Sequence, residues 1–328
     1  MSKGIGRILQ FGIAKETVRG TPETAASYYI PFNEATVDEK RDMVTEDQSR
    51  GVIEGSTGDQ VVKKYVESTL KAPIGDKHFG LILLAALGAV SDGTHAGETI
   101  VYDHTYTVGE SAQHQALSLF IDDPLAGADY KFGLGSVKSL EITYERGKFI
   151  DYSLALMSKA GTTATLTPST TTENLFLPND LTFKVATNLA GLAGASALLI
   201  RSFKLKIEKS LESDDVLGSL DPNDFLNKQF KISGEVECVW QNESDFKTAF
   251  LAGTQKALRI DLIKSGITIG SAANPELQID LAKVVFTELS RPISVNNVVT
   301  QRLQFNAHYS ITDTKMITAK LTNLVASY

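Results

Sequence analysis

The chain is poor in cysteine, in net positive charge and in long apolar runs, and each shortage excludes a class of protein. Cys238 is the one cysteine among 328 residues, so an intrachain disulfide is impossible. The formal net charge of −7 argues against a protein that holds nucleic acid tightly, because such proteins present a basic surface. The longest apolar run, His78–Val90, is too short to span a bilayer. These shortages favour a protein that needs neither an oxidising compartment nor a membrane.

The remaining composition is ordinary for a globular chain. Hydrophobic residues make up 42% of the sequence and charged residues 22%. The length predicts about two domains. No signal peptide is visible at the N-terminus, where charge soon interrupts the apolar residues. We therefore expect a soluble product that is made in the cytoplasm.

Catalytic and cofactor motifs are missing from the sequence. It contains no nucleotide P-loop, no dinucleotide-binding glycine motif after a strand and no nucleophile elbow. His95, His104 and His114 occur in one region, but their spacing matches no known metal-ligand pattern. The sequence predicts no catalytic residues, no metal site and no cofactor, and hence a protein that is not an enzyme. Cys238 lies in an alternating stretch and is interpreted as a small core residue.

A weak internal repeat is the most informative positive feature. Lys64–Ala86 and Lys231–Gly253 align without gaps, and each reads as a strand, a polar turn and a short apolar helix. The identical pairs are Lys64/Lys231, Phe79/Phe246, Leu84/Leu251 and Ala85/Ala252. Two similar β-rich halves are typical of a protein that builds a larger object from copies of itself.

Alternation of apolar and polar residues predicts strands throughout both halves. Asp76 is a candidate N-cap for a helix that ends near Leu87, where Gly88 closes it. Residues 91–98 are expected to form a loop. The predicted strands are Ile8–Ala14, Tyr28–Phe32, Val61–Leu70, Thr99–Val108, Gln115–Ile121, Val137–Tyr144, Phe149–Met157, Thr182–Ala186, Leu198–Lys209, Gln229–Trp240, Ala257–Lys264, Leu277–Leu289 and Val298–Tyr309.

Two polar stretches, Glu34–Asp59 and Leu211–Lys228, are predicted to be long exposed loops, one in each half. The Thr-rich stretch at 161–174 is interpreted as a linker, with a Thr-rich edge strand as the alternative. These boundaries predict a first domain at 1–160 and a second at 175–328. The fold class is mainly β, with two tandem antiparallel sandwiches or barrels, each flanked by one short helix.

Three short motifs resemble the phage tail tube protein family. The opening, Phe11–Pro22 (FGIAKETVRGTP), resembles the start of those proteins. Gly218–Phe225 (GSLDPNDF) followed by Lys231–Glu237 resembles the family's second strand–loop–strand unit, and Ile317–Tyr328 resembles its C-terminal close. Together the motifs bracket nearly the whole chain in the expected order.

The resemblance implies a structural virion protein that forms stacked rings around a hollow lumen. It implies a tube that holds a tape-measure protein, contacts tail-tip and terminator proteins, and passes DNA without binding it specifically. Most members use six single-domain subunits, whereas this chain is about twice as long and carries a repeat. We therefore expect two tube domains per chain and a homotrimeric, pseudo-hexameric ring. The alternative is one tube domain with an outer decorating domain.

The candidate contact residues lie on the predicted loops and the N-terminal arm. The ring-stacking candidates are Asp38, Arg41, Glu46, Arg50, Glu54, Asp214, Asp215 and Asp221, and the arm candidates are Lys15, Glu16 and Arg19. A carbohydrate-binding or adhesin-like β-sandwich is the alternative function. It is disfavoured because the long loops carry almost no aromatic residues. The expected locations are the virion tail and, during assembly, the host cytoplasm.

Overall fold

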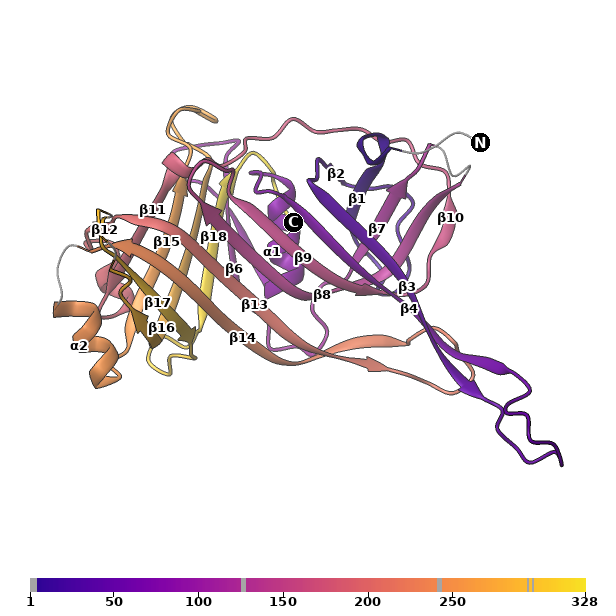
Figure 1. The fold of residues 1–328 in the computed structure, drawn as a ribbon. Helices are drawn as coiled ribbons and strands as arrows, with labels where there is room; N and C mark the ends of the chain where they lie inside the picture. Colours follow the sequence, from indigo (N-terminus) through magenta and orange to yellow (C-terminus); the bar gives the residue numbers. More distant parts are fainter. Residues whose placement is uncertain (1–4, 125–127, 241–243, 294, 297) are drawn as a thin grey trace.

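The computed structural model describes residues 5–124, 128–240, 244–293, 295–296 and 298–328 (Figure 1). The α-helices are α1 (His78–Leu87) and α2 (Ser244–Ala252), and the short 3-10 helices are η1 (Gly6–Ile8), η2 (Pro178–Asp180) and η3 (Leu189–Leu192). The strands of the first half are β1 (Gln10–Lys15), β2 (Tyr28–Ile30), β3 (Glu34–Thr45), β4 (Asp59–Pro73), β5 (Gly88–Thr94), β6 (Tyr102–Val108), β7 (Leu117–Asp122), β8 (Asp129–Glu145), β9 (Asp151–Ser158) and β10 (Thr162–Ala164). Those that follow are β11 (Leu181–Ala186), β12 (Ala197–Leu198), β13 (Ile200–Asp214), β14 (Asp224–Val239), β15 (Lys256–Ile263), β16 (Glu276–Ser290), β17 (Thr300–Ala307) and β18 (Ile317–Asn323).

The mainly antiparallel β architecture confirms the predicted fold class, since 18 strands accompany two short α-helices in the described part of the chain. Alternation predicted strands well where one face is buried. In β9, for example, Tyr152, Leu154 and Leu156 face the core while their neighbours are partly exposed. The first helix is confirmed, and Gly88 ends it with a left-handed φ of 99°, which costs glycine little.

Three loop predictions are wrong in part. The first half of Glu34–Asp59 is strand, because β3 pairs with β4 from Glu34 to Thr45, and residues 46–58 lie outside the ladder. In Leu211–Lys228, strands β13 and β14 likewise pair as far as Asp214 and Asp224. The segment at 91–98 is partly strand, since β5 pairs with β6 through Thr94. All three segments are polar, so their pairing leaves no apolar periodicity in the sequence.

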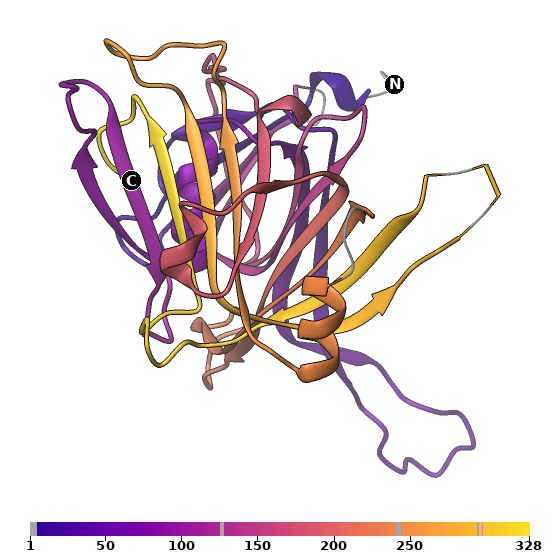
Figure 2. The same ribbon diagram turned by 90° about the vertical axis from the view of Figure 1, so that its left-hand side faces the viewer.

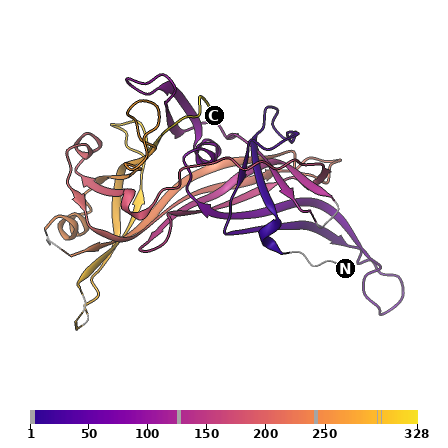
Figure 3. The same ribbon diagram turned by 90° about the horizontal axis from the view of Figure 1, so that it is seen from above.

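Eight strands form one continuous antiparallel surface through the middle of the molecule. Their order is β3–β4–β9–β8–β13–β14–β17–β16. The β8–β13 pair joins the first half of the chain to the second along this surface. Figure 3 shows these long strands running through the elongated molecule from one end towards the other.

Strands β8 and β16 each bend out of this surface into a second layer. The N-terminal part of β8 joins the order β2–β1–β7–β8–β10. The N-terminal part of β16 joins β12–β11–β15–β16–β18–β6–β5. Buried aliphatic and aromatic side chains, together with α1, fill the space between the layers. The ring centroids of Phe79 in α1 and Tyr152 in β9, for example, are 5.4 Å apart.

The same strand arrangement therefore occurs twice. The set β1, β2, β3–β4, β7, β8 and β9 corresponds to β11, β12, β13–β14, β15, β16 and β17 by its pairings.

One detail of the sequence alignment between the two halves is wrong. Val66 pairs with the last residue of β9 and Ile232 with the last residue of β17, so these two residues are equivalent. The gapless alignment places Val66 opposite Ser233 instead.

The Thr-rich stretch packs against the first half. Its start forms β10, which pairs with β8. Glu173 accepts hydrogen bonds from the backbone N–H groups of Lys77 and His78 at the start of α1, and its carboxylate lies 2.6 Å from Nδ1 of His78. Asp76 does not cap the helix, because its carboxylate accepts hydrogen bonds from Asn174. The carboxylate of Glu173, from a segment distant in sequence, thus caps the N-terminus of α1 in place of Asp76.

Candidate assembly surfaces

The β3–β4 hairpin projects far beyond the body of the molecule (Figure 1). Asp38 and Arg41 lie on the exposed part of β3. Glu46, Arg50 and Glu54 lie beyond the end of β3, where the Arg50 guanidinium is 3.5 Å from the Glu46 carboxylate. These five predicted stacking residues therefore occupy one projection, and Asp38 and Arg41 are held by strand pairing rather than by a loop.

The β13–β14 hairpin runs in the same direction and touches the first hairpin. Lys63 Nζ of β4 lies 2.7 Å from Asp215 Oδ2. The backbone N–H of Lys64 donates to the carbonyl of Leu220 over 2.8 Å. Asp214 ends β13, and Asp221 is exposed in the turn. Two hairpins, one from each half, are thus fastened together as a pair, and this contact was not predicted from the sequence.

Apolar side chains stand exposed at both tips. Ile53 is fully exposed and Val52 is 64% exposed on the first hairpin, and Leu217 is fully exposed on the second. A hollow of about 570 Å³ lies between the hairpins, lined in part by Val62, Val216 and Leu217. Clustered apolar groups at the end of a projection are typical of a contact surface.

The N-terminal arm is tied to distant parts of the chain. Lys15 Nζ donates to the backbone carbonyl of Tyr328 over 2.8 Å. Glu16 is 3% exposed and accepts hydrogen bonds from the N–H groups of Leu134 and Gly20 at 2.6 and 2.7 Å. Burial raises the pKa of the Glu16 carboxyl and outweighs these hydrogen bonds. The Glu16 carboxylate is thus buried and bonded within its own chain.

Arg19, the third arm candidate, crosses to the second half. Its guanidinium bonds both carboxylate oxygens of Asp224 at 2.6–3.0 Å, and it donates to the carbonyl of His114. Figure 2, turned by 90° from Figure 1, shows how closely the elements of both halves interleave. The arm therefore connects the first half to the start of β14 in the second half.

The β8–β13 junction is a sheet joint between the two similar halves. Leu140, Ile142 and Tyr144 of β8 lie opposite Ile207, Leu205 and Phe203 of β13, and all six side chains are buried on the core face. On the other face, Lys204 Nζ lies 2.9 Å from the Glu141 carboxylate. At this joint, the β13–β14 hairpin of the second half extends the sheet formed by β3, β4, β9 and β8 of the first half.

Each end of the eight-strand surface is an open edge among the described residues. β3 pairs with β4 alone, and the segment Glu288–Ser290 of β16 pairs with β17 alone. The β16–β17 hairpin extends away from the body in Figure 2. Beside this edge Arg291 stacks on Trp240, with 4.4 Å between the guanidinium and the ring centroid. Exposed sheet edges invite pairing with another strand.

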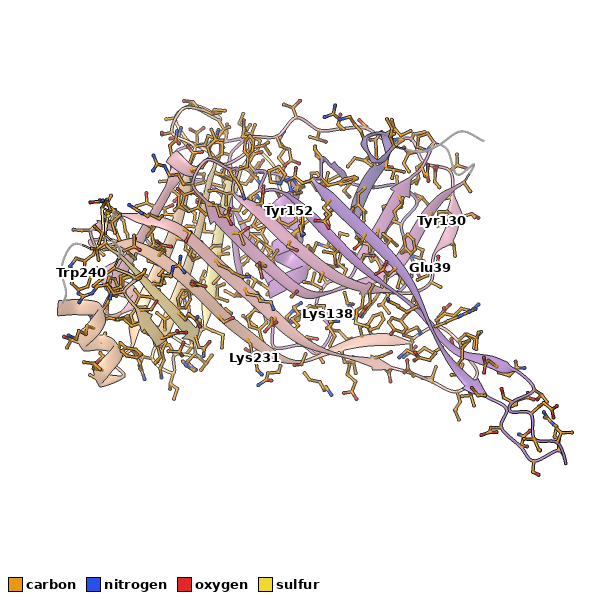
Figure 4. The ribbon with its side chains drawn as sticks, viewed as in Figure 1. Glu39, Tyr130, Lys138, Tyr152, Lys231 and Trp240 are labelled. Carbon is orange, nitrogen blue, oxygen red and sulfur yellow. The ribbon has the colours of Figure 1, made fainter. Side chains whose placement is uncertain are left out.

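The face of this surface that points away from the core carries charges in opposite pairs. Lys138 pairs with Glu67, Lys206 with Glu208 and Arg302 with Glu237. Lys138 and Lys231 lie on this face, as Figure 4 shows. Since most of these cations face a carboxylate, the surface offers little unpaired positive charge for phosphate groups.

Within the described part of the chain, no cluster of three or more His, Cys, Asp or Glu residues is arranged to hold a metal ion. No helix among those residues has the length and apolar character needed to cross a membrane. Cys238 is buried, and burial raises the pKa of its thiol to about 12, so the thiol is protonated at neutral pH.

The sequence model of the phage tail tube protein family matches residues 6–307. The chain belongs to the phage tail tube protein family. No curated protein matches it. This tail tube protein is thus a component of a virion tail.

Proposed function

We propose that this tail tube protein is a non-enzymatic structural subunit whose rings stack into the hollow phage tail tube. Each chain supplies two similar units, and three chains form a pseudo-sixfold ring. The β8–β13 joint carries this proposal, because it already joins two like units edge to edge within one chain. Repeating the same joint between chains extends the sheet and covers the open edges.

The face with paired charges is assigned to the lumen. A closed ring of these sheets has the core layer and the helices outside, which leaves that face inside. DNA passes along a surface whose cations are neutralised by Glu67, Glu141, Glu208 and Glu237. Tape-measure, tail-tip and terminator proteins are the further partners of this tube.

The paired hairpins are assigned to contacts between rings. Their tips project from the body and carry exposed Val52, Ile53 and Leu217 with charged neighbours. Contact with the next ring would cover these apolar groups. The N-terminal arm is fastened within its own chain through Glu16 and Arg19, so the stacking role falls mainly on the hairpins.

Negative-stain electron microscopy of the concentrated protein tests the function. We expect hollow tubes, and a mass measurement of isolated rings is expected to give three chains. Dispersed monomers at every concentration, with no tubes even on an isolated tail tip, would contradict the proposal. A ring of six chains would contradict the two-unit assignment alone.

A shortened hairpin tests the stacking assignment. The N–H of Glu46 donates to the carbonyl of Gly58, so residues 47–57 can be replaced by an Asn-Gly turn without disturbing the ladder. We expect single rings that do not stack. Ile53→Ser is expected to weaken stacking, and Ile100→Ser, at a 58% exposed position outside the hairpins, is the matched control.

A further inference from the structure

The internal joint defines a residue-by-residue register for the contact between chains. This inference rests on the proposed ring and adds to it the identity of the paired residues. It requires two equivalences, one between β8 and β16 and one between β13 and β3. Each follows from observed strand pairings.

A β-bulge fixes the first equivalence. In β8, Val137 pairs with Leu156 and Ser139 with Ala155, so Lys138 is the extra residue. In β16, Phe286 pairs with Phe305 and Glu288 with Gln304, so Thr287 is the extra residue. Glu288 is therefore the counterpart of Ser139, the first residue after the bulge in each strand.

The returning strands fix the second equivalence. Val66 and Ile232 are equivalent because each pairs with the last residue of its returning strand, β9 or β17. Their preceding neighbours, Tyr65 and Lys231, pair with Lys40 of β3 and Glu208 of β13 respectively. Lys40 is therefore the counterpart of Glu208.

Ser139 pairs with Glu208 at the internal joint. We propose that β16 of one chain pairs antiparallel with β3 of the next, with Glu288 directly opposite Lys40 of the second copy. Ser290 then faces Asp38, and Arg291 faces Val37. Pro292 ends the ladder because it has no backbone N–H.

The charges fit this register. Glu288 and Lys40 occupy the face that points away from the core, as do their counterparts, and both are exposed in the single chain. Directly opposed charges of opposite sign stabilise a strand pair. On the core side, Arg291 becomes the diagonal neighbour of Glu39, whose place in the internal joint is taken by the buried Ile207.

This difference in composition has a physical reason. The internal joint never separates, so it can be apolar. The edges β3 and β16 must stay soluble until assembly, and charged residues on a sheet edge oppose premature pairing. In the ring Lys40 meets Glu288, and Glu39 has Arg291 as its diagonal neighbour.

Cysteine pairing tests the register. In a Cys238→Ser background, Lys40→Cys with Glu288→Cys places two thiols on directly opposite residues, within disulfide reach. Oxidation of assembled rings is expected to give covalently closed trimers on a denaturing gel. Asp42→Cys with Glu288→Cys is the matched control, one pair further along β3 and out of reach, and is expected to remain monomeric.

Charge reversal gives a second readout that needs no disulfide. Lys40→Glu and Glu288→Lys are each expected to weaken ring formation, and the double variant to restore it. Rings that crosslink at the control pair, or single variants that assemble normally, would overturn the register and leave the proposed function standing. Absence of rings from the unmodified chain at every concentration, even on an isolated tail tip, would overturn both.

Discussion

Arg19 of the N-terminal arm and Asp224 at the start of β14 form a bidentate ion pair, with guanidinium nitrogens 2.6–3.0 Å from both carboxylate oxygens. The pair joins segments that lie 205 residues apart in sequence. Burial tends to raise the pKa of Asp224, but the hydrogen bonds and charge of Arg19 outweigh it, and the net shift is downward. The contact is therefore a source of stability that depends on pH.

Arg19→Ala is expected to lower the free energy of unfolding by about 2 kcal/mol at pH 7, because it leaves a mostly buried carboxylate without its cation. Urea unfolding of the unassembled chain measures this. The pKa of Asp224 is lower in the folded chain than in the unfolded chain. The ion pair therefore contributes fully to stability above the pKa of the unfolded chain, and this contribution is lost as the pH falls through the pKa of the folded chain. Arg146→Ala, on an exposed turn, is the control, and equal losses in both variants would contradict the prediction.

Lys209 is expected to make stability rise with pH. Burial, with a smaller effect of the Arg19 charge, lowers the pKa of its ammonium group to about 7, while Nζ donates to the carbonyl of Ala85. Between about pH 7 and pH 10 the unfolded chain binds a proton that the folded chain lacks, so the unfolding free energy increases by up to about 1.4 kcal/mol per pH unit.

Lys209→Met is expected to remove this rise. Thermal unfolding at pH 7.0 and pH 9.5 measures the difference, and comparison of the two proteins cancels the other titrating groups. An identical pH dependence in the variant would contradict the assignment. The same measurement on Lys228→Met, at an exposed lysine of β14, is expected to match the unmodified chain.

Tyr328→Phe is expected to destabilise the unassembled chain by about 1–3 kcal/mol, because it removes two hydrogen bonds of the buried phenol. The phenol donates to the carbonyl of Lys77 at 2.5 Å and accepts from Asn323 at 2.7 Å. Its ring covers Gly80 of α1, where a Cβ would collide with it, so Gly80→Ala is expected to be destabilising too. Tyr309→Phe, at a 50% exposed position, is the control for thermal unfolding.

Val236→Pro is expected to prevent folding of the β13–β14–β17 region. Val236 pairs with Phe203 on one side and Leu303 on the other, so a proline removes a hydrogen bond from an internal strand, at a cost of about 3 kcal/mol or more. Far-ultraviolet circular dichroism measures the loss of sheet. Val216→Pro, in the turn between the hairpin strands, is the control, and a wild-type spectrum for Val236→Pro would refute the expectation.

Sequence reasoning predicted the parts of the fold that bury an alternating apolar face. Leu154 and Leu156, or Leu303 and Phe305, mark their strands directly. It failed for β3, whose residues from Asp38 to Thr45 are all exposed, because only pairing with β4 makes them a strand. The charged sequence of β3 is typical of a loop. The same charges oppose pairing of this exposed edge strand with other chains.

The candidate surfaces were predicted in part. The polar stretches containing Glu46 and Asp221 did indicate the two projections, but nothing local in the sequence signals that Lys63 of one contacts Asp215 of the other. Glu173 gives no local signal either, since it caps α1 from a distant segment. Long-range contacts of single polar residues have no periodicity, so they emerge only from the folded chain.

The place of β18 has a consequence for synthesis on the ribosome. This strand follows the other described strands in sequence, lies between β16 and β6, and therefore completes a layer to which the first half contributes β5 and β6. A nascent chain lacks that strand until residues 317–323 have been made. The layer that lies behind the eight-strand surface is therefore completed only after the strands of both halves have been made.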